Sequence, residues 1–271
     1  MNIYVYIGKK SLEDDLRLAA LMDALSAGGC HVTVLGPGQE PGKDAGMLMS
    51  VGGDGTFLSA SALVAERGIP VVGVNLGRLG FLSENRPEDV ADAILNGKYS
   101  IEERTVLKAC VEDGLRKDEP VYALNECTVH RSGAAMLGVE VTVDGTRLPT
   151  YWADGLIVST SSGSTAYSLS AGGPIVLPQS RVLIITPIAP HNLNVRPLVV
   201  PDTSVITLRM QSRDRKVIFT ADNRTAETDG DARIEISVAQ FSLKRVRLNK
   251  SDFINALTEK LFWGEDIRNI K

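Results

Sequence analysis

Residues 47–56 read Met-Leu-Met-Ser-Val-Gly-Gly-Asp-Gly-Thr, an apolar stretch that runs into three glycines around one carboxylate. The apolar stretch predicts a buried strand, and residues 56–65 predict a helix. Glycines let the backbone approach a phosphate chain closely, and a helix N-terminus favours an anion. Two interpretations follow. Either Asp54 caps the helix while the glycines turn the chain, or the turn is a phosphate loop that carries a catalytic acid.

The pattern around this turn extends through the first hundred residues. Strand-like runs at residues 3–7, 31–35, 47–51 and 71–74 alternate with helical patterns, the last of which covers residues 87–95. This alternation predicts an α/β fold, a mostly parallel sheet with helices on both faces. Ligands of such sheets bind at the C-terminal ends of the strands. The glycine turn and the loop of residues 75–81 both follow such strand ends.

The pattern changes near residue 99. Residues 139–143 alternate with period two and lead into Asp144-Gly145, a two-residue hairpin signal, and similar runs recur up to residue 248. Closely spaced strands predict an antiparallel, all-β domain, a sandwich or something near it. We therefore expect an α/β domain over residues 1–98, an all-β domain over residues 99–250, and a C-terminal helical segment, residues 251–271, that packs back on the first domain.

Composition narrows the classes of partner. The formal net charge is −4, and the 29 Lys and Arg residues are scattered, which gives no electrostatic reason to expect nucleic acid or an anionic membrane as a partner. Three widely spaced cysteines argue against a disulfide framework or a zinc site. No segment approaches the roughly 18 apolar residues that span a bilayer. These features predict a soluble cytoplasmic protein.

Two further polar clusters interrupt the β pattern. Residues 153–168 place an Asp-Gly turn and a run of hydroxyl residues around a short strand, and Tyr167 adds a flat ring suited to a base or a ribose. The alternative is a flexible Ser/Gly loop. Asn125-Glu126 interrupts the run at residues 121–130. The pair either faces solvent on the outer side of a strand or grips a vicinal diol.

Taken together and in this order, six motifs resemble those of the NAD kinases: Gly-Gly-Asp-Gly-Thr at residues 52–56, Leu79-Gly80-Phe81, Asn125-Glu126, Asp154-Gly155, Gly-Ser-Thr-Ala-Tyr at residues 163–167, and Pro190-His191. The resemblance runs from about residue 47 to 200. It implies transfer of the γ-phosphoryl of ATP, or of another phosphoryl donor, to the 2′-hydroxyl of the adenosine ribose of NAD. The product is NADP.

The same resemblance implies roles for particular residues. Asp54 is the expected general base, with phosphates cradled by Gly52, Gly53 and Gly55. Asn125 and Glu126 are expected to bind the NAD ribose, and Asp154 to contact the nicotinamide end. The remaining nucleotide-binding positions implied are Arg78, Phe81, Thr165, Ala166, Tyr167, Ser168, Leu169, Ser170 and Ala189.

The resemblance also implies partners. We expect Mg²⁺ to arrive with ATP, and neighbouring subunits of a homodimer or homotetramer to complete the NAD pocket. At three positions the chain departs from the family. Ser161 stands where the family usually has proline, Trp152 where a basic residue often precedes the Asp-Gly pair, and Asp231 where the family often has Gln.

Two other functions stay open at this point. Lipid kinases of the diacylglycerol or sphingoid type share Gly-Gly-Asp-Gly, but they should need a membrane-facing apolar or basic surface. A non-catalytic NADP-binding sensor could keep the whole fold. The presence of Asp54 argues against the sensor, because a protein that only binds has no need for a base at that turn.

Overall fold

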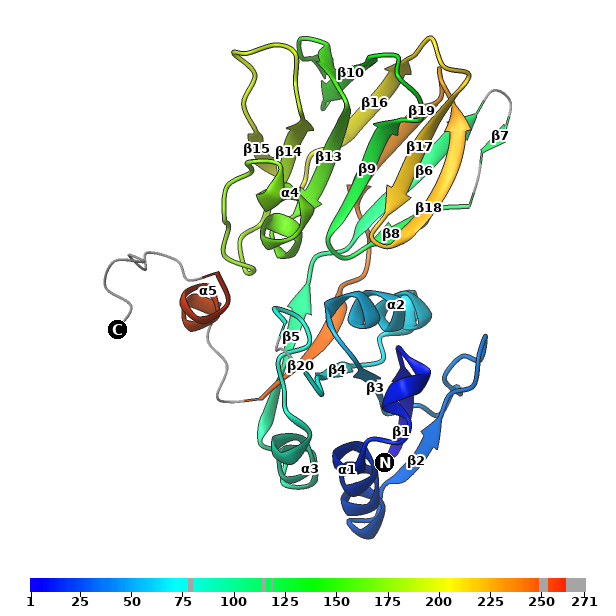
Figure 1. Cartoon of the computed structure of the whole chain (residues 1–271), viewed down its shortest axis with the longest axis vertical. Helices are drawn as coiled ribbons and strands as arrows, with labels where there is room; N and C mark the ends of the chain where they lie inside the picture. Colours follow the sequence, from blue (N-terminus) through cyan, green and yellow to red (C-terminus); the bar gives the residue numbers. More distant parts are fainter. Residues whose placement is uncertain (78–79, 114–115, 118, 249–252, 262–271) are drawn as a thin grey trace. The chain divides into compact units, whose positions relative to one another are not determined.

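A computed structural model describes residues 1–77, 80–113, 116–117, 119–248 and 253–261 (Figure 1). The chain forms two compact units. Unit 1 comprises residues 1–103 and 243–271, and unit 2 comprises residues 104–242. The C-terminal part of the chain thus returns to the first unit. No helix within the described ranges has the length and apolar character needed to cross a membrane.

Unit 1 is built on a mostly parallel sheet with strand order β2-β1-β3-β4-β20-β5. Strands β1, β2, β3 and β4 pair in parallel, and β20 pairs in parallel with β4 through Arg245 and Val71. β3 and β4 are buried throughout, as expected for apolar strands covered on both faces. The strands are β1 (Asn2–Ile7), β2 (His31–Val34), β3 (Met47–Val51), β4 (Val71–Val74), β5 (Tyr99–Arg104) and β20 (Leu243–Leu248).

Helices cover both faces of this sheet, which confirms the predicted α/β fold (Figure 1). α1 and α3 pack their apolar residues into one core with the alternate residues of β1, β3 and β4. α2 covers the opposite face, where a side chain added at Gly73 of β4 would meet Phe57. The helical segments of unit 1 are η1 (Lys10–Leu12), α1 (Leu16–Ala27), α2 (Asp54–Val64), η2 (Ala65–Arg67), α3 (Pro87–Leu95) and α5 (Phe253–Leu261).

The boundary between the units differs from the one expected from the sequence. The strand-like run at residues 241–248 is expected in the all-β domain because it follows other strands closely, but residues 243–248 form β20 beside β4 in the parallel sheet. Its periodicity is that of a strand in either sheet, so pattern alone does not assign it. α5 then contacts the loop after β4, with Phe253 against Phe81 at a ring-centroid distance of 6.1 Å.

Unit 2 is a sandwich of two antiparallel sheets, as the hairpin pattern predicted. One sheet has the order β11-β10-β16-β19-β6-β7, with β12 paired to β10 and β8 to β6, and the other has the order β15-β14-β13-β9-β17-β18. Alternate residues of both sheets meet in one apolar core. The first sheet contains β6 (Leu107–Asp113), β7 (Arg116–Lys117), β8 (Val121–Ala123), β10 (Leu137–Val143), β11 (Thr146–Arg147), β12 (Tyr151–Ala153), β16 (Ile206–Gln211) and β19 (Arg233–Val238).

The second sheet presents its other face to a short helical segment. Cys127 and Val129 of β9 point into the core, so Glu126, Thr128 and His130 point to the opposite face. Figure 1 shows α4 lying over this sheet near β13. The elements are β9 (Glu126–Arg131), β13 (Gly155–Thr160), η3 (Ser162–Thr165), α4 (Tyr167–Ser170), β14 (Val182–Ile188), β15 (Leu198–Pro201), β17 (Lys216–Ala221) and β18 (Arg224–Asp229).

Candidate functional site

In unit 1 the Asp54 carboxylate is held by three consecutive backbone N–H groups of the loop after β4. Phe81 N–H donates to Oδ2 at 2.8 Å, and the N–H groups of Leu82 and Ser83 donate to Oδ1 at 3.0 and 2.8 Å. Helix α2 begins at Asp54, with Gly53 as its N-cap and no capping bond from a side chain. The first interpretation of the turn is therefore wrong, because this carboxylate binds a distant loop instead of capping its own helix.

The glycines around Asp54 differ in their surroundings. A side chain built at Gly53 or Gly55 would meet no atom within 4 Å, so this part of the turn is open. Gly52 has a φ of 148°, and a side chain there would collide with Thr56. A bare, open backbone at a helix N-terminus is the kind of surface that binds phosphate.

The predicted site residue Phe81 and its neighbour Gly80 belong to the same loop. The Phe81 ring is half-buried and lies 5.1 Å, centroid to ammonium, beneath Lys260 of α5. Gly80 approaches Asp54 so closely that a side chain at this position would lie 2.0 Å from Oδ1. Arg78 lies outside the described residues.

In unit 2, Asn125 and Glu126 are buried, with exposed fractions of 7% and 8%. The predicted strand at residues 121–130 is in fact two strands that belong to different sheets, and the pair lies where the chain crosses from β8 to β9. Within the described residues, Asn125 Oδ1 and Glu126 Oε2 have no hydrogen-bond partner. Buried polar atoms without partners are rare, and these two are free to accept hydrogen bonds from a ligand hydroxyl. The solvent-facing interpretation is wrong.

Asp222 was missed in the sequence, yet it holds this pair in place. Its carboxylate accepts hydrogen bonds from the backbone N–H groups of Leu124, Asn125 and Glu126 at 2.8, 2.8 and 3.2 Å. Asp222 has a left-handed φ of 53°, a conformation that aspartate tolerates better than most residues. It lies 96 to 98 residues beyond these amides. An isolated aspartate after a strand gave no signal of the contact.

The pKa of Glu126 is raised to about 8, chiefly by burial and also by the neighbouring Asp222 carboxylate, while the N–H of Tyr167 opposes the shift. Burial raises the pKa of Asp222 as well, against the three amides that lower it. Two adjacent buried carboxyl groups disfavour a second negative charge. Glu126 therefore holds a proton near neutral pH and can both donate to and accept from a hydroxyl group.

A Glu126→Gln variant should make the protein more stable than the wild type, increasingly so as the pH rises from 4.5 to about 8. A carboxyl group whose pKa is raised by folding lowers the free energy of unfolding as the pH rises through this window. The neutral amide of glutamine does not titrate and has no such effect. We expect a gain on the order of 2 kcal/mol at the upper end, read as a Tm difference of roughly 5 °C. Glu227→Gln, at an exposed position of β18, should show no such trend. A pH-independent Tm difference for Glu126→Gln would contradict the burial argument.

The Ser/Gly stretch is an ordered cover over the second sheet and not a flexible loop, which corrects the alternative interpretation. Residues 161–164 are buried, and Ser168 of α4 shares a hydrogen bond of 2.9 Å with Thr186 of β14. Thr165, Ala166 and Leu169 are half-buried, and Ser170 is exposed. The Thr160 hydroxyl of β13 donates to the carbonyl of Leu124 at 2.7 Å, which ties this stretch to the Asn125 turn.

A Gly163→Ala variant should lose stability and weaken any ligand bound at Asn125. The added methyl would lie 2.2 Å from the Asn125 carbonyl oxygen, and backbone cannot yield as a flexible side chain can. We expect a loss of about 1–3 kcal/mol by thermal unfolding. Gly77→Ala, whose methyl would meet only Asn75 Oδ1 at 3.7 Å, serves as the control. Equal Tm values for the two variants would contradict the close approach.

Tyr167 stacks on His130 of β9, with ring centroids 5.7 Å apart and planes at 11°. The ring is partly exposed, so its outer face is available to a second flat group. Burial lowers the pKa of His130, and the Asp154 carboxylate opposes this shift. His130 was not among the predicted site residues, although the alternation of β9 places it on the same face as Glu126.

Asp154 lies between β12 and β13 and forms an ion pair of 2.7 Å with Arg131. Both side chains are about one third exposed. A basic group thus stands beside Asp154, supplied by β9, whereas Trp152 two residues earlier is partly exposed and packs against Gly138. Ala189 follows β14, is exposed, and has a left-handed φ of 45°. Because Gly155 pairs with Ile188, Asp154 and Ala189 lie at neighbouring strand ends.

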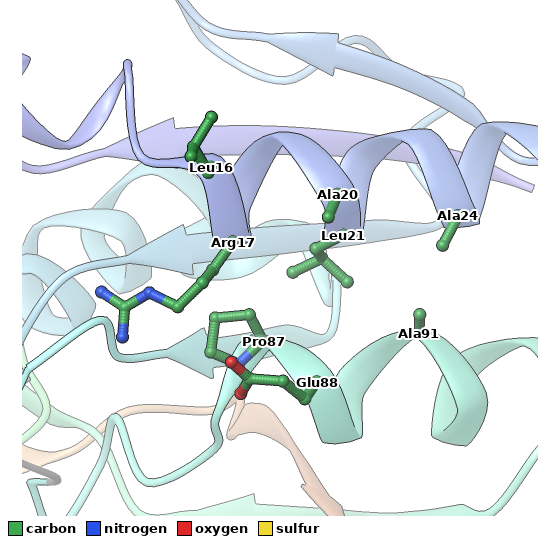
Figure 2. A pocket seen from close by; sticks show the side chains of 8 residues that line it. All are labelled: Leu16, Arg17, Ala20, Leu21, Ala24, Pro87, Glu88 and Ala91. Atoms are coloured by element: carbon green, nitrogen blue, oxygen red, sulfur yellow. The ribbon is translucent and has the colours of Figure 1, made fainter.

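The groove between α1 and α3 is a separate feature of unit 1 (Figure 2). It has a volume of about 330 Å³ and is lined by Leu16, Arg17, Ala20, Leu21, Ala24, Pro87, Glu88 and Ala91. None of these is a predicted site residue, and the lining is mainly apolar. Among the described residues, no group of three or more His, Cys, Asp or Glu side chains is arranged to hold a metal ion.

Comparisons with known proteins show the family of the chain. Residues 37–99 match the family model of the ATP-NAD kinase N-terminal domain, and residues 124–248 match that of the C-terminal domain. The chain is 43% identical to an NAD kinase of Flavobacterium psychrophilum over 228 residues, which covers 82% of this chain and 78% of that protein. An NAD kinase of Bacteroides fragilis is also 43% identical, over 83% of this chain and 79% of its own length.

Two solved structures resemble this chain over most of its length. Yeast NADH kinase complexed with NADH superposes with a TM-score of 0.86 at 25% identity, over 99% of this chain and 90% of the yeast chain. An NAD kinase from Archaeoglobus fulgidus in complex with ATP superposes with a TM-score of 0.75 at 29% identity, over 92% of this chain and 95% of the other.

Proposed function

Because the chain belongs to the ATP-NAD kinase family, we propose that it transfers the γ-phosphoryl group of ATP to the 2′-hydroxyl of the adenosine ribose of NAD. A bond forms between the 2′-oxygen and the γ-phosphorus, the bond from that phosphorus to the β,γ-bridging oxygen breaks, and ADP leaves. The hydroxyl proton passes to a base. The observation that carries the proposal is the Asp54 carboxylate, fixed beside an open glycine turn at a helix N-terminus.

Asp54 is suited to the role of base. A carboxylate has about four acceptor positions. Oδ1 accepts two N–H groups and Oδ2 accepts one, so Oδ2 keeps a position for the proton of the ribose hydroxyl. Phosphoryl transfer relies mainly on positioning and charge stabilisation, and a rigidly held carboxylate supplies the former. Gly52, Gly53 and Gly55 would line the phosphates with backbone only.

Unit 2 carries the residues suited to the nucleoside. Asn125 Oδ1 and Glu126 Oε2 are unpartnered among the described residues, and together they can bind the two hydroxyls of a ribose. The exposed face of Tyr167 can stack on a flat base, and the Asp154–Arg131 pair and Ala189 lie at the far end of the same strands. Thr165, Ala166, Ser168, Leu169 and Ser170 complete the cover, and Phe81 of unit 1 is a further nucleotide contact.

The finer features follow the same proposal. Mg²⁺ would enter as part of the MgATP substrate, bound chiefly by phosphate and water oxygens. The reaction would take place in the cytoplasm, and a homodimer or homotetramer would complete the NAD pocket. Gel filtration with light scattering at micromolar concentration tests the assembly, and an active monomer would contradict it.

The decisive experiment is a coupled assay with the purified protein, MgATP and NAD, in which product is read by a dehydrogenase that accepts only NADP. Signal that requires both substrates supports the proposal. Binding of NAD without turnover with ATP, polyphosphate or another nucleoside triphosphate would favour the sensor instead. Binding to lipid vesicles would favour the lipid kinase. Both family matches are to NAD kinase domains, and no observation of the structure favours either alternative.

A further inference from the structure

The loop that holds Asp54 is itself held from its other side by the C-terminal part of unit 1. Lys260 of α5 donates to the carbonyl of Gly80. Arg245 Nη2 of β20 donates to the carbonyls of Phe81 and Leu82 at 3.1 and 3.3 Å. These are the same peptide units whose N–H groups bind Asp54. Each of the three consecutive peptides therefore lies between a cation at its oxygen and the carboxylate at its nitrogen.

This arrangement aligns three peptide dipoles with the charges at both ends. A cation on the carbonyl and an anion on the N–H polarise the same peptide in the same direction, which strengthens both hydrogen bonds. Arg245 is only 3% exposed, so its charge is weakly screened by solvent. Its guanidinium also forms ion pairs with Glu84 at 2.6 Å and with Glu102 at 3.4 Å. These two pairs fix the orientation of the planar guanidinium.

Lys260 supplies the second cation from a different element. Its ammonium lies over the Phe81 ring, 5.1 Å from the ring centroid. Burial lowers the pKa of this amine, while the nearby Glu84 and Asp54 carboxylates oppose the shift. Nothing in the sequence joins these residues to the glycine turn, because Lys260 is 180 residues away from Gly80.

We propose that Arg245 and Lys260 are positioning residues that fix the Asp54 carboxylate through the three peptides of residues 80–83. The inference rests on the proposed role of Asp54 as the base. It assigns β20 and α5 a part in the reaction.

The test is steady-state kinetics of the full chain with Lys260→Met, which removes the ammonium and keeps an unbranched apolar side chain. We expect kcat to fall by about 10-fold to 100-fold, because small displacements of a reacting group have effects of this size. KM for NAD and ATP should change less than about three-fold, since the residues proposed to bind them are intact. Lys260→Arg should restore most of kcat, because it returns a cation to the Gly80 carbonyl.

Lys244→Met is the matched control, since Lys244 lies in the same strand as Arg245 but its amine lies beside Gly68. It should keep the wild-type kcat. Arg245→Lys tests the other cation. Lysine keeps a positive charge beside Glu84 and Glu102, but its ammonium lacks the planar, multiple N–H groups with which the guanidinium binds the carboxylates and the two loop carbonyls together. We therefore expect kcat to fall while KM is preserved.

Three results would overturn the inference: a wild-type kcat in Lys260→Met, an equal loss in Lys244→Met, or a loss in Lys260→Met that Lys260→Arg does not restore. The Asp54→Asn variant shows whether a negative result concerns the positioning role of Arg245 and Lys260 or the proposed role of Asp54 as the base. If Asp54→Asn is inactive while Lys260→Met is fully active, only the positioning role is wrong. If Asp54→Asn is active, the base itself is wrongly assigned.

Discussion

Replacing Asp54 with asparagine is expected to lower kcat by about 10²–10⁴-fold, the usual loss when a general base is removed, while NAD still binds. The amide cannot take the proton of the attacking hydroxyl. The substitution also disturbs the loop, because the carboxylate accepts three N–H groups and the amide has a single acceptor oxygen. If Oδ1 keeps its two partners, the new NH₂ group faces the N–H of Phe81.

The measurement is the coupled assay together with NAD titration and thermal unfolding of the variant. A preserved NAD affinity with a lost kcat assigns the effect to the chemical step. Gly80→Ala is an informative companion, because its methyl would lie 2.0 Å from Asp54 Oδ1 and would displace a carboxylate that is still present. We expect it to lose kcat as well. Turnover of Asp54→Asn within about ten-fold of the wild type would show that Asp54 is not the base.

Replacing Asp222 with alanine is expected to have the largest effect on stability and on the affinity for NAD. Three buried N–H groups, those of residues 124–126, would lose their acceptor. Each buried donor left unsatisfied costs about 1–3 kcal/mol. Alanine is also disfavoured at the left-handed φ of 53°. A total of about 4 kcal/mol corresponds to a fall in Tm of roughly 10 °C.

Because Asn125 and Glu126 are held by these bonds, the KM for NAD should rise in the same variant, while the KM for ATP should change little. Asp222→Asn is the matched control, since asparagine tolerates the left-handed conformation and keeps one acceptor oxygen. It should lie between the wild type and Asp222→Ala in both Tm and KM. A KM for NAD that is unchanged in the alanine variant would mean that Asp222 stabilises unit 2 without positioning the ribose site.

Local sequence patterns were sufficient to locate much of the candidate site. The glycine turn could be located because an apolar strand precedes it and a helix follows it, and β3 and α2 flank Gly52 and Gly53 in the structure. Asn125-Glu126 stood out because two polar residues interrupt an apolar run. Their burial could not be predicted, because the run looks like one strand when it is read alone. The change of sheet from β8 to β9 creates the buried turn.

The sequence by itself determined the alternation of strands and helices in the first hundred residues, the two fold classes, and the presence of a carboxylate at a glycine turn. These depend on periodicity and turn chemistry, which act over a few neighbouring residues. Only the tertiary structure decided what holds each functional group. Phe81, Leu82 and Ser83 lie 27 to 29 residues beyond Asp54, and Lys260 lies 180 residues beyond Gly80. Contacts at such separations follow from strand order and helix packing. No local sequence pattern marks which backbone amide or which lysine will contact a distant functional group.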